Sequence, residues 1–434
     1  MQNKVFKNAT WIIICKVIQS ILALLINMLT ARYLGPSNFG TISYAASLVT
    51  FVVPIMQLGL NSILVQEIIH NPQKEGEVLG TALTMSVTSS LFCIIGVVSF
   101  SFVANYNEKE TIIVCALYSV ILVFQAVDII QYWFQAKLLS KFTSLSMLCS
   151  YLLVASYKVF LLLSHKSIYW FSISNALDYM LIAFSLVVIY YKLGGQKLSF
   201  SFSLAKYMFN RGKHFIVSSL MITIFSQTDK IMIKLLLNET ITGYYSAAVA
   251  CALLSNFVFA AIIDSVRPSI IEAHIKNTKI YEERIIQLYS LIIYLSLVQS
   301  ILMTLFAKFI VLVLYGNDYL DSVILLRLVV WYTTFSYIGS VRSIWILTQE
   351  KQKYLWIINL SGALTNVFLN LILIPYFGAI GAAIASVFTQ FFTNVLIGYI
   401  IKPISDNNRL LIKSLNPKYL LTLSMNLLSK KKSE

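Results

Sequence analysis

The sequence predicts an all-α membrane protein with twelve transmembrane helices in two bundles of six. Two features of the composition support this fold class. Of the 434 residues, 58% are hydrophobic and only 12% are charged, whereas about a quarter of a typical soluble chain is charged. Apolar runs of about 20 residues, the length of one membrane-spanning helix, also recur from Trp11 to Ile401.

The twelve expected spans follow one another with short connections on one side and longer, basic connections on the other. An even number of spans places both termini on the same side of the membrane. The spans are expected at roughly 10–33, 38–65, 78–104, 111–136, 142–163, 168–191, 214–237, 243–268, 285–315, 322–348, 354–375 and 378–401.

The distribution of basic residues sets the expected orientation. If the N-terminus is cytoplasmic, the outer connections hold only Arg32, Lys109 and Lys166, and nearly all other Lys and Arg residues outside the spans lie on the inner side. This is the positive-inside pattern. The net charge of +15 is therefore attributed to topology and to anionic lipid headgroups, and not to binding of nucleic acid.

The domain organisation follows from the longest inner connection. We expect a first bundle over 1–191, a linker over 192–213, a second bundle over 214–402 and a cytoplasmic tail over 403–434. Within the tail, Lys418–Leu428 is rich in leucine, is followed by three lysines and is too short to span, so it is expected to lie in the inner membrane interface.

A short internal repeat supports the two bundles. Six helices separate its two copies, so both halves should share one orientation and be related by an axis along the membrane normal. At an offset of 203 residues, Leu34, Gly40, Ser43 and Ala45 align with Leu237, Gly243, Ser246 and Ala248.

The stretch Phe225–Ala248 carries the most informative charges within a span. On a helix, Lys230 and Lys234 share one stripe with Ser226 and Gln227, and Asp229 lies at its flank. A charge in hydrocarbon costs several kcal/mol, so this stripe should face protein or a watery cavity. Lys234 lies near the helix end, where extension of its side chain to the interface is an equally good explanation.

Cations outnumber acids within the spans. A positive interior at several depths suits the passage of a bulky anion, phosphate above all. The expected translocation residues are Lys16, Lys230, Lys234, Arg327 and Arg342; the other cations are Lys158, Arg267 and Lys308, and the acids are Asp128, Asp178, Asp229 and Asp264. Arg267 is expected to pair with Asp264, three residues earlier, and Lys308 to lie at the interface.

Motifs for catalysis, metal binding or a cofactor are not apparent in the sequence. It contains no P-loop and no nucleophile elbow, and the acidic pair Asp318 and Asp321 is interpreted as a solvated outer loop. The four histidines are scattered singly and the five cysteines have no CxxC spacing. The expectation is therefore a protein without enzymatic activity, metal or cofactor.

Four stretches, in order along the chain, resemble bacterial polysaccharide exporters. These are ARYLGPSNFGTISYAASLVTFVVPIMQLGLNSILVQE, SQTDKIMIKLLLNETITGYYSAAV, LYGNDYLDSVILLRLVVW with the following ILTQEKQKY, and NLSGALTNVFLNLILIPYFGAIGAAIASVF. Together they are similar to O-antigen or capsule flippases of the Wzx type. That family lies within the superfamily that includes MATE exporters and lipid II flippases.

The resemblance implies two six-helix lobes around a central cavity, alternating access, and location in the bacterial cytoplasmic membrane with both termini inside. It implies a cargo of oligosaccharide repeat units on undecaprenyl pyrophosphate, with polysaccharide polymerase or chain-length proteins as partners. Coupling to a proton or sodium gradient is implied by analogy. The residues that match in kind are Lys16, Asp128, Lys230, Arg327 and Arg342 for the cavity, and Asp128, Asp178 and Asp229 for coupling.

Two alternatives remain at the level of sequence. A multidrug exporter of the same superfamily often carries cationic cargo, and the excess of cations over acids within the spans argues against it. A membrane polysaccharide polymerase would need a large outer loop with catalytic residues, but every expected outer loop is short.

Overall fold

The computed structural model describes residues 2–420, and side chains from Cys15 onward. The described residues form helices joined by short connections, without a β-strand among them. By packing, the chain divides into two compact units, Met1–Gly243 and Tyr244–Glu434. This division rests on packing and does not test the predicted grouping of the spans into two bundles of six, which stays a prediction.

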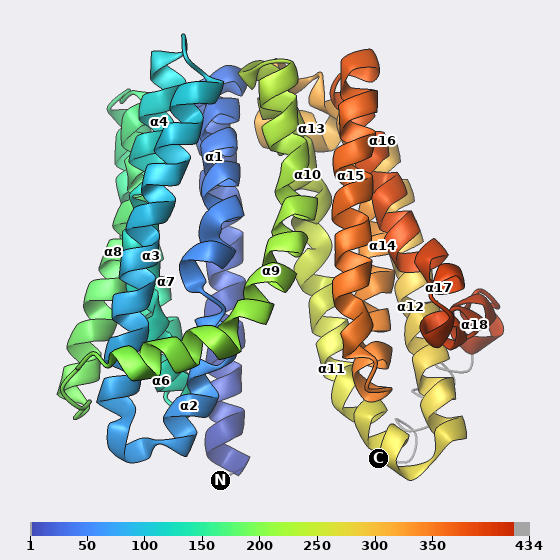
Figure 1. The fold of residues 1–434 in the computed structure, drawn as a ribbon. Helices are drawn as coiled ribbons and strands as arrows, with labels where there is room; N and C mark the ends of the chain where they lie inside the picture. The colour runs from blue at the N-terminus through green and yellow to red at the C-terminus, as the bar shows by residue number, and fades with distance from the viewer. Residues whose placement is uncertain (1, 421–434) are drawn as a thin grey trace. The chain divides into compact units, whose positions relative to one another are not determined.

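The first helix, α1 (Gln2–Gln57), contains two membrane spans. Its 56 residues would reach about 84 Å if straight, far beyond the roughly 30 Å of a bilayer core. The backbone leaves helical geometry at Gly35, with φ 71° and ψ 172°, a conformation that glycine adopts readily. The chain turns back there, so that the two parts of α1 run in opposite directions (Figure 1).

The rest of the first unit consists of helices that pack around α1. Helices α3, α4, α7 and α9 each contact α1, and α8 packs on α4, α5 and α7. The bounds are α2 (Leu64–His70), α3 (Glu75–Ala104), α4 (Lys109–Ser119), α5 (Ile121–Val127), α6 (Gln131–Ala136), α7 (Ser140–Leu163), α8 (Ile168–Lys192) and α9 (Phe202–Leu236).

Residues 193–201 are held along the start of α3. Gly76 donates its backbone N–H to Gln196 Oε1 at 3.1 Å, and Ser201 donates its N–H to Thr81 Oγ1 at 3.1 Å. The 35-residue α9 follows. It is longer than a bilayer requires, and its first part runs obliquely across the lower part of the unit in the view of Figure 1. The part of the expected linker that follows Ser201 therefore belongs to helix α9.

Gly40 and Gly243, which occupy aligned positions of the predicted repeat, make a reciprocal close contact. A Cβ atom on Gly40 would lie 1.8 Å from the carbonyl oxygen of Glu239, and one on Gly243 would lie 2.0 Å from that of Pro36. Pro36 and Glu239 are themselves separated by the offset of the repeat. Each copy thus contributes a glycine and a carbonyl to the same contact.

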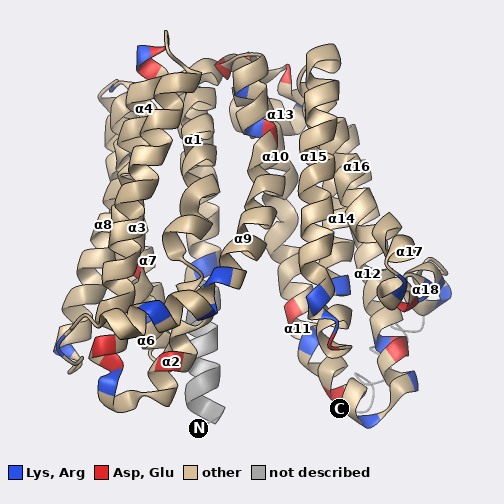
Figure 2. Ribbon diagram, in the orientation of Figure 1, with Lys and Arg blue, Asp and Glu red and all other residues tan. Residues whose placement is uncertain are grey.

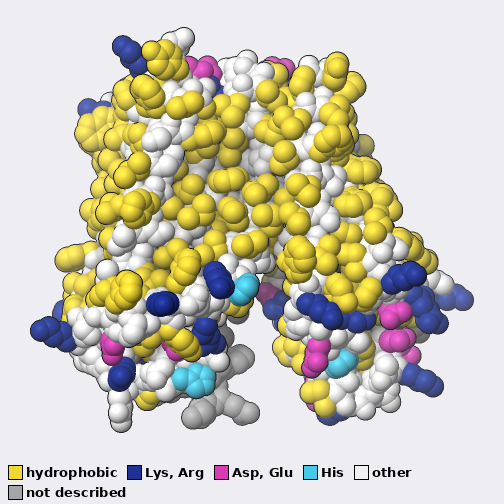
Figure 3. Space-filling model, in the orientation of Figure 1, with side chains coloured by type: hydrophobic (Ala, Val, Ile, Leu, Met, Phe, Trp, Pro, Cys, Tyr) yellow, Lys and Arg dark blue, Asp and Glu magenta, His cyan; other side chains and the backbone are white. Residues whose placement is uncertain are grey.

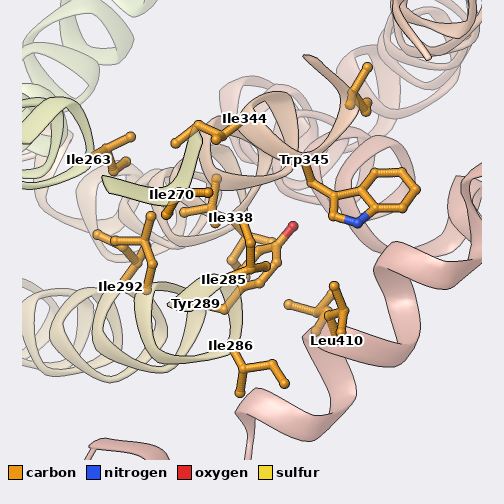
Figure 4. Close-up of a cluster of buried hydrophobic side chains, with 14 of the residues drawn as sticks. Ile263, Ile270, Ile285, Ile286, Tyr289, Ile292, Ile338, Ile344, Trp345 and Leu410 are labelled. Carbon is orange, nitrogen blue, oxygen red and sulfur yellow. The ribbon is translucent and has the colours of Figure 1, made fainter. Parts of the chain in front are cut away.

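The second unit is built largely on α12 and α14, which pack against each other. Its main buried cluster joins residues of α11, α12, α14 and α18, with Tyr289, Ile338 and Trp345 among them (Figure 4). The bounds are α10 (Glu239–Ala252), α11 (Asn256–Lys276), α12 (Thr278–Leu305), α13 (Ala307–Tyr315), α14 (Ser322–Thr348), α15 (Leu355–Phe377), α16 (Ala379–Phe391), α17 (Ile397–Ile400) and α18 (Ser405–Ser414).

The beginning of the expected cytoplasmic tail is docked on this unit. In α18, Leu410 and Leu411 are buried, and Asn407 accepts a hydrogen bond from Tyr289 at 2.9 Å through its Oδ1 atom. The predicted interfacial segment Lys418–Leu428 lies largely outside the described residues.

Eleven helical segments of the described chain are long and apolar enough to cross a membrane. They match the twelve predicted spans because Cys15–Gln57 combines the first two. In each unit, charged residues gather at the helix ends and the middle is largely free of them (Figure 2). A broad hydrophobic band covers the middle of the visible face of each unit (Figure 3). Exposed side chains such as Phe92 and Phe184 therefore face lipid.

Candidate translocation site

Lys234 lies in the last turn of α9 and is enclosed by acids. Only 3% of its side chain is exposed, and its Nζ atom lies 2.5 Å from Glu108 Oε2 and 3.6 Å from Glu239 Oε2. The ammonium group also lies 5.9 Å from the ring centroid of Tyr44, within reach of a cation–π interaction. Lys234 is therefore paired within the protein and does not extend into solvent.

Two further hydrogen bonds hold the partners of Lys234 in place. Thr111 donates to Glu108 Oε2 at 2.8 Å, and Asn105 donates to the hydroxyl of Tyr44 at 3.1 Å. Partial burial would raise the pKa of Glu108, but the hydrogen bonds from Lys234 and Thr111 and the charge of Lys234 hold it below its usual value. Glu108 thus stays ionised and keeps the buried ammonium neutralised.

No pattern in the sequence identifies Glu108 as a partner of Lys234. The two residues are 126 positions apart, and Glu108 lies in a short polar connection that resembles any solvated turn. Only the packing of α9 against α1, α3 and their neighbours brings the carboxylate and the ammonium group together.

Asp229 and Lys230 lie about one helical turn before Lys234, nearer the middle of α9. Asp229 is buried and Lys230 is half-buried. Adjacent residues of a helix point in directions about 100° apart, so the two side chains do not share one environment. Lys230 retains exposed surface, which a residue that meets a cargo requires.

Two other acids of the first unit differ in their surroundings. Asp178 lies on α8 one turn after Asn175, whose Oδ1 atom accepts a hydrogen bond from Lys158 at 2.9 Å, and the charges of Asp178 and Lys158 attract each other. Asp128 is buried, at 9% exposure, and its carboxylate accepts a hydrogen bond from Gln131 at 2.6 Å. The structure therefore places Asp128, Asp178 and Asp229 in different settings.

Arg342 lies in the interior of the second unit. It is 5% exposed and donates to the carbonyl of Thr393 and, at 3.1 Å, to Asn394 Oδ1. Both acceptors belong to the π-helical segment Phe392–Leu396, where a widened turn leaves carbonyl groups in need of a donor. Its guanidinium is thus engaged by neutral acceptors from this segment.

Lys16 and Arg327 are both exposed, the first on α1 and the second on α14. The expected pair of Arg267 and Asp264 is confirmed, with 3.6 Å between Nη1 and Oδ1. Among the described residues, no group of three or more His, Cys, Asp or Glu side chains could hold a metal ion.

The fold is shared with membrane transporters of known structure. A structure titled "Lipid II flippase MurJ, inward closed conformation" superimposes with a TM-score of 0.75 at 15% identity, covering 95% of this chain and 92% of the other. The inward-facing conformation of a multidrug resistance MATE family transporter of the MOP superfamily superimposes with a TM-score of 0.70 at 13% identity, covering 89% and 96%. The molecule is therefore a multi-pass membrane protein with the MATE and MurJ fold.

The sequence identifies the family. Residues 5–274 match the family described as polysaccharide biosynthesis protein, and the chain belongs to that family. A curated relative, the uncharacterized membrane protein MJ1068 of Methanocaldococcus jannaschii, is 28% identical over 245 residues, which are 52% of this chain and 47% of the relative. The match thus spans about half the length of that relative.

Proposed function

We propose that this protein is a flippase that moves oligosaccharide repeat units linked to undecaprenyl pyrophosphate from the inner to the outer leaflet of the bacterial cytoplasmic membrane. Membership of the polysaccharide biosynthesis protein family carries this proposal. The fold supports it, since a lipid II flippase has the same architecture. The glycan would be of the O-antigen or capsule class, and transport would proceed by alternating access.

The cations within the spans fit a pyrophosphate cargo. Phosphate oxygens form strong, charge-assisted hydrogen bonds with Lys and Arg, and several weak contacts let an anion move on. Lys16, Lys230 and Arg327 retain exposed surface, and we assign contact with the pyrophosphate to them. Lys234 and Arg342 are engaged by protein groups, so these contacts would have to open before either residue could meet the cargo.

The alternative of drug export remains within the same fold, because a multidrug transporter superimposes almost as well. The charges within the spans favour the anionic cargo: Lys16, Lys230 and Arg327 retain exposed surface, whereas Asp128 and Asp229 are buried. The more accessible acids, Asp178 and Asp264, each lie beside a cation, Lys158 and Arg267 respectively. A cationic drug would require accessible acids instead.

Deletion of the gene and complementation with variants tests the function. The deletion should remove surface glycan and strand single repeat units on undecaprenyl pyrophosphate at the inner leaflet. Single units that reach the surface unpolymerised would point to a polymerase, and an unchanged glycan in a host without a second flippase would point to drug export.

Complementation with Lys230→Ala tests the site. We expect surface glycan to fall at least about tenfold, because the variant lacks a cation that offsets the lost hydration of the pyrophosphate. Membrane-inserted protein should stay at the wild-type amount. Lys308→Ala is the matched control, since Lys308 is exposed near the start of α13 and should export normally. Normal glycan in a well-expressed Lys230→Ala strain would exclude the assigned role.

A further inference from the structure

The last helical segment long enough to cross the membrane contains the π-helical segment Phe392–Leu396, which joins α16 to α17. π-helices are rare and are often found at functional sites. Two side chains from other helices of the second unit donate to its backbone carbonyls: Arg342 of α14 to Thr393, and Asn408 of α18 to Val395 at 2.9 Å. Helix α18 thus follows the π-helical segment in the chain and folds back to contact it.

The contacts around the π-helical segment are close. A Cβ atom on Gly339 of α14 would lie 2.2 Å from Asn394 Oδ1, and one on Gly398 of α17 would lie 2.3 Å from Asn408 Oδ1. The same Asn394 oxygen accepts a hydrogen bond from Arg342 at 3.1 Å. Arg342, the π-helical segment and α18 therefore form one connected polar network without spare room, and a shift of one member displaces the others.

This buried network is only partly satisfied. Arg342 Nε, Asn407 Nδ2 and Asn408 Oδ1 are buried without a hydrogen-bond partner. Across the part of the chain that the structure describes, no carboxylate forms an ion pair with Arg342. Buried polar groups without partners and a buried charge without a counter-charge both cost free energy. Release of α18 would relieve part of this cost, because its two asparagines would then meet water.

Other contacts oppose that release. The ten-residue α18 buries Leu410 and Leu411, and Asn407 accepts a hydrogen bond from Tyr289 at 2.9 Å. The opposite face of the helix is exposed, with Ile412 at 54% exposure. A short helix that buries one face is the kind of element that opens locally, without unfolding of the rest of the molecule.

We propose that α18 is a conformational latch on the second unit. While α18 is docked, it holds the π-helical segment, and through that segment it keeps the guanidinium of Arg342 engaged. When α18 is released, the segment and Arg342 are free to rearrange. The latch couples the end of the last span to a cation inside the unit. It requires no cargo, so its test is independent of the proposed function.

Hydrogen exchange of the purified full-length protein in lipid nanodiscs tests the latch. In the wild type, the backbone amides of Ser405–Ser414 should exchange together and faster than those of α14, because α18 opens without the rest of the unit. Arg342→Met should speed the exchange of α18 at least about fivefold, because the segment that Asn408 contacts loses its other donor. Asn408→Leu should act in the same direction. Arg342→Lys keeps the charge but not the fork of donors and should have a smaller effect.

Ser300→Ala is the matched control, since the hydroxyl groups of Ser300 and Thr334 form a buried hydrogen bond of 3.0 Å between α12 and α14. It should leave the exchange of α18 unchanged. Wild-type α18 that exchanges only at the rate of α14, an Arg342→Met variant with wild-type exchange, or an equal increase in Ser300→Ala would each overturn the proposal. If Arg342→Met does not fold, wild-type exchange of α18 in both Arg342→Lys and Asn408→Leu would overturn it instead.

Discussion

The side chain of Lys234 shows how a charge can be placed at the C-terminal end of a membrane-spanning helix without exposure. Its ammonium group is almost fully buried, whereas its partners Glu108 and Glu239 are 45% and 35% exposed. The energetic consequences are asymmetric. A carboxylate that loses Lys234 can still be hydrated, but a buried ammonium that loses its carboxylates cannot.

This asymmetry predicts that Glu108→Gln is more destabilising than Lys234→Met. Glu108→Gln removes the nearest negative charge from a buried ammonium and should cost about 1–3 kcal/mol. Lys234→Met removes the buried charge and keeps most of the volume, so its cost should be smaller. Thermal unfolding of the purified variants in detergent measures both. Glu110→Gln is the control, since Glu110 is exposed in the first turn of α4. A Glu108→Gln variant as stable as this control would contradict the assignment.

The same pair predicts a dependence of stability on pH. The pKa of Glu108 is lowered in the folded state from its usual value of 4.5. The stabilisation that ionised Glu108 gives the folded state is therefore present above pH 4.5, and it is lost as the pH falls through the lower folded-state pKa. The difference in melting temperature between the wild type and Glu108→Gln should be constant near neutral pH and shrink below about pH 4.5. A difference that instead grew on acidification would show that the sign is wrong.

At the scale of elements, the turn after the first span of each repeat is fixed by glycine. Gly40 and Gly243 each leave room for a backbone carbonyl of the other copy, so no side chain fits there unless the turns move apart. Both glycines were found from the sequence because they share the repeat offset. Their mutual contact could not be found, since the alignment relates positions and does not say which of them touch.

Gly40→Ala and Gly243→Ala should each destabilise the protein by about 1–3 kcal/mol, because the added methyl group meets a backbone carbonyl that cannot easily retreat. Gly96→Ala is the matched control. Gly96 lies inside α3 with nothing within 4 Å of an added Cβ, and alanine there should stabilise the helix by about 0.5–1 kcal/mol. Melting temperatures in detergent separate the two classes. Similar values for Gly40→Ala and Gly96→Ala would mean that the contact does not matter.

For the whole molecule, the spans could be predicted from the sequence and the pairing of charges could not. Hydrophobicity over about 20 residues is a local property, so each predicted span has a helical counterpart, and the pair of Arg267 and Asp264 followed from helical spacing alone. The nearer acidic partner of Lys234, Glu108, lies 126 residues away, and the acceptors of Arg342 lie about 50 residues away. Their contacts depend on the packing of helices, which periodicity does not determine.

The orientation in the membrane is a property of the whole chain and rests on its basic connections. Lys74 and Lys279 lie in connections predicted to be cytoplasmic, and Asn107 and Asp318 in connections predicted to be outside; all four are exposed. Each compact unit contributes one position of each kind. If the two halves share one orientation, Lys74 and Lys279 must lie on one side of the membrane, and Asn107 and Asp318 on the other.

Single cysteines at these four positions, in a chain whose native cysteines are replaced, test the orientation. Asn107→Cys and Asp318→Cys should react with a membrane-impermeant maleimide on intact cells, where the outer membrane admits the reagent. Lys74→Cys and Lys279→Cys should react only after the cytoplasmic membrane is opened, because Lys and Arg hold these connections on the inner side. Reaction of Lys74→Cys on intact cells would mean that the first unit has the opposite orientation to the predicted one. Opposite results in the two units would mean that the halves are inverted, and the axis inferred from the repeat would then lie in the membrane plane.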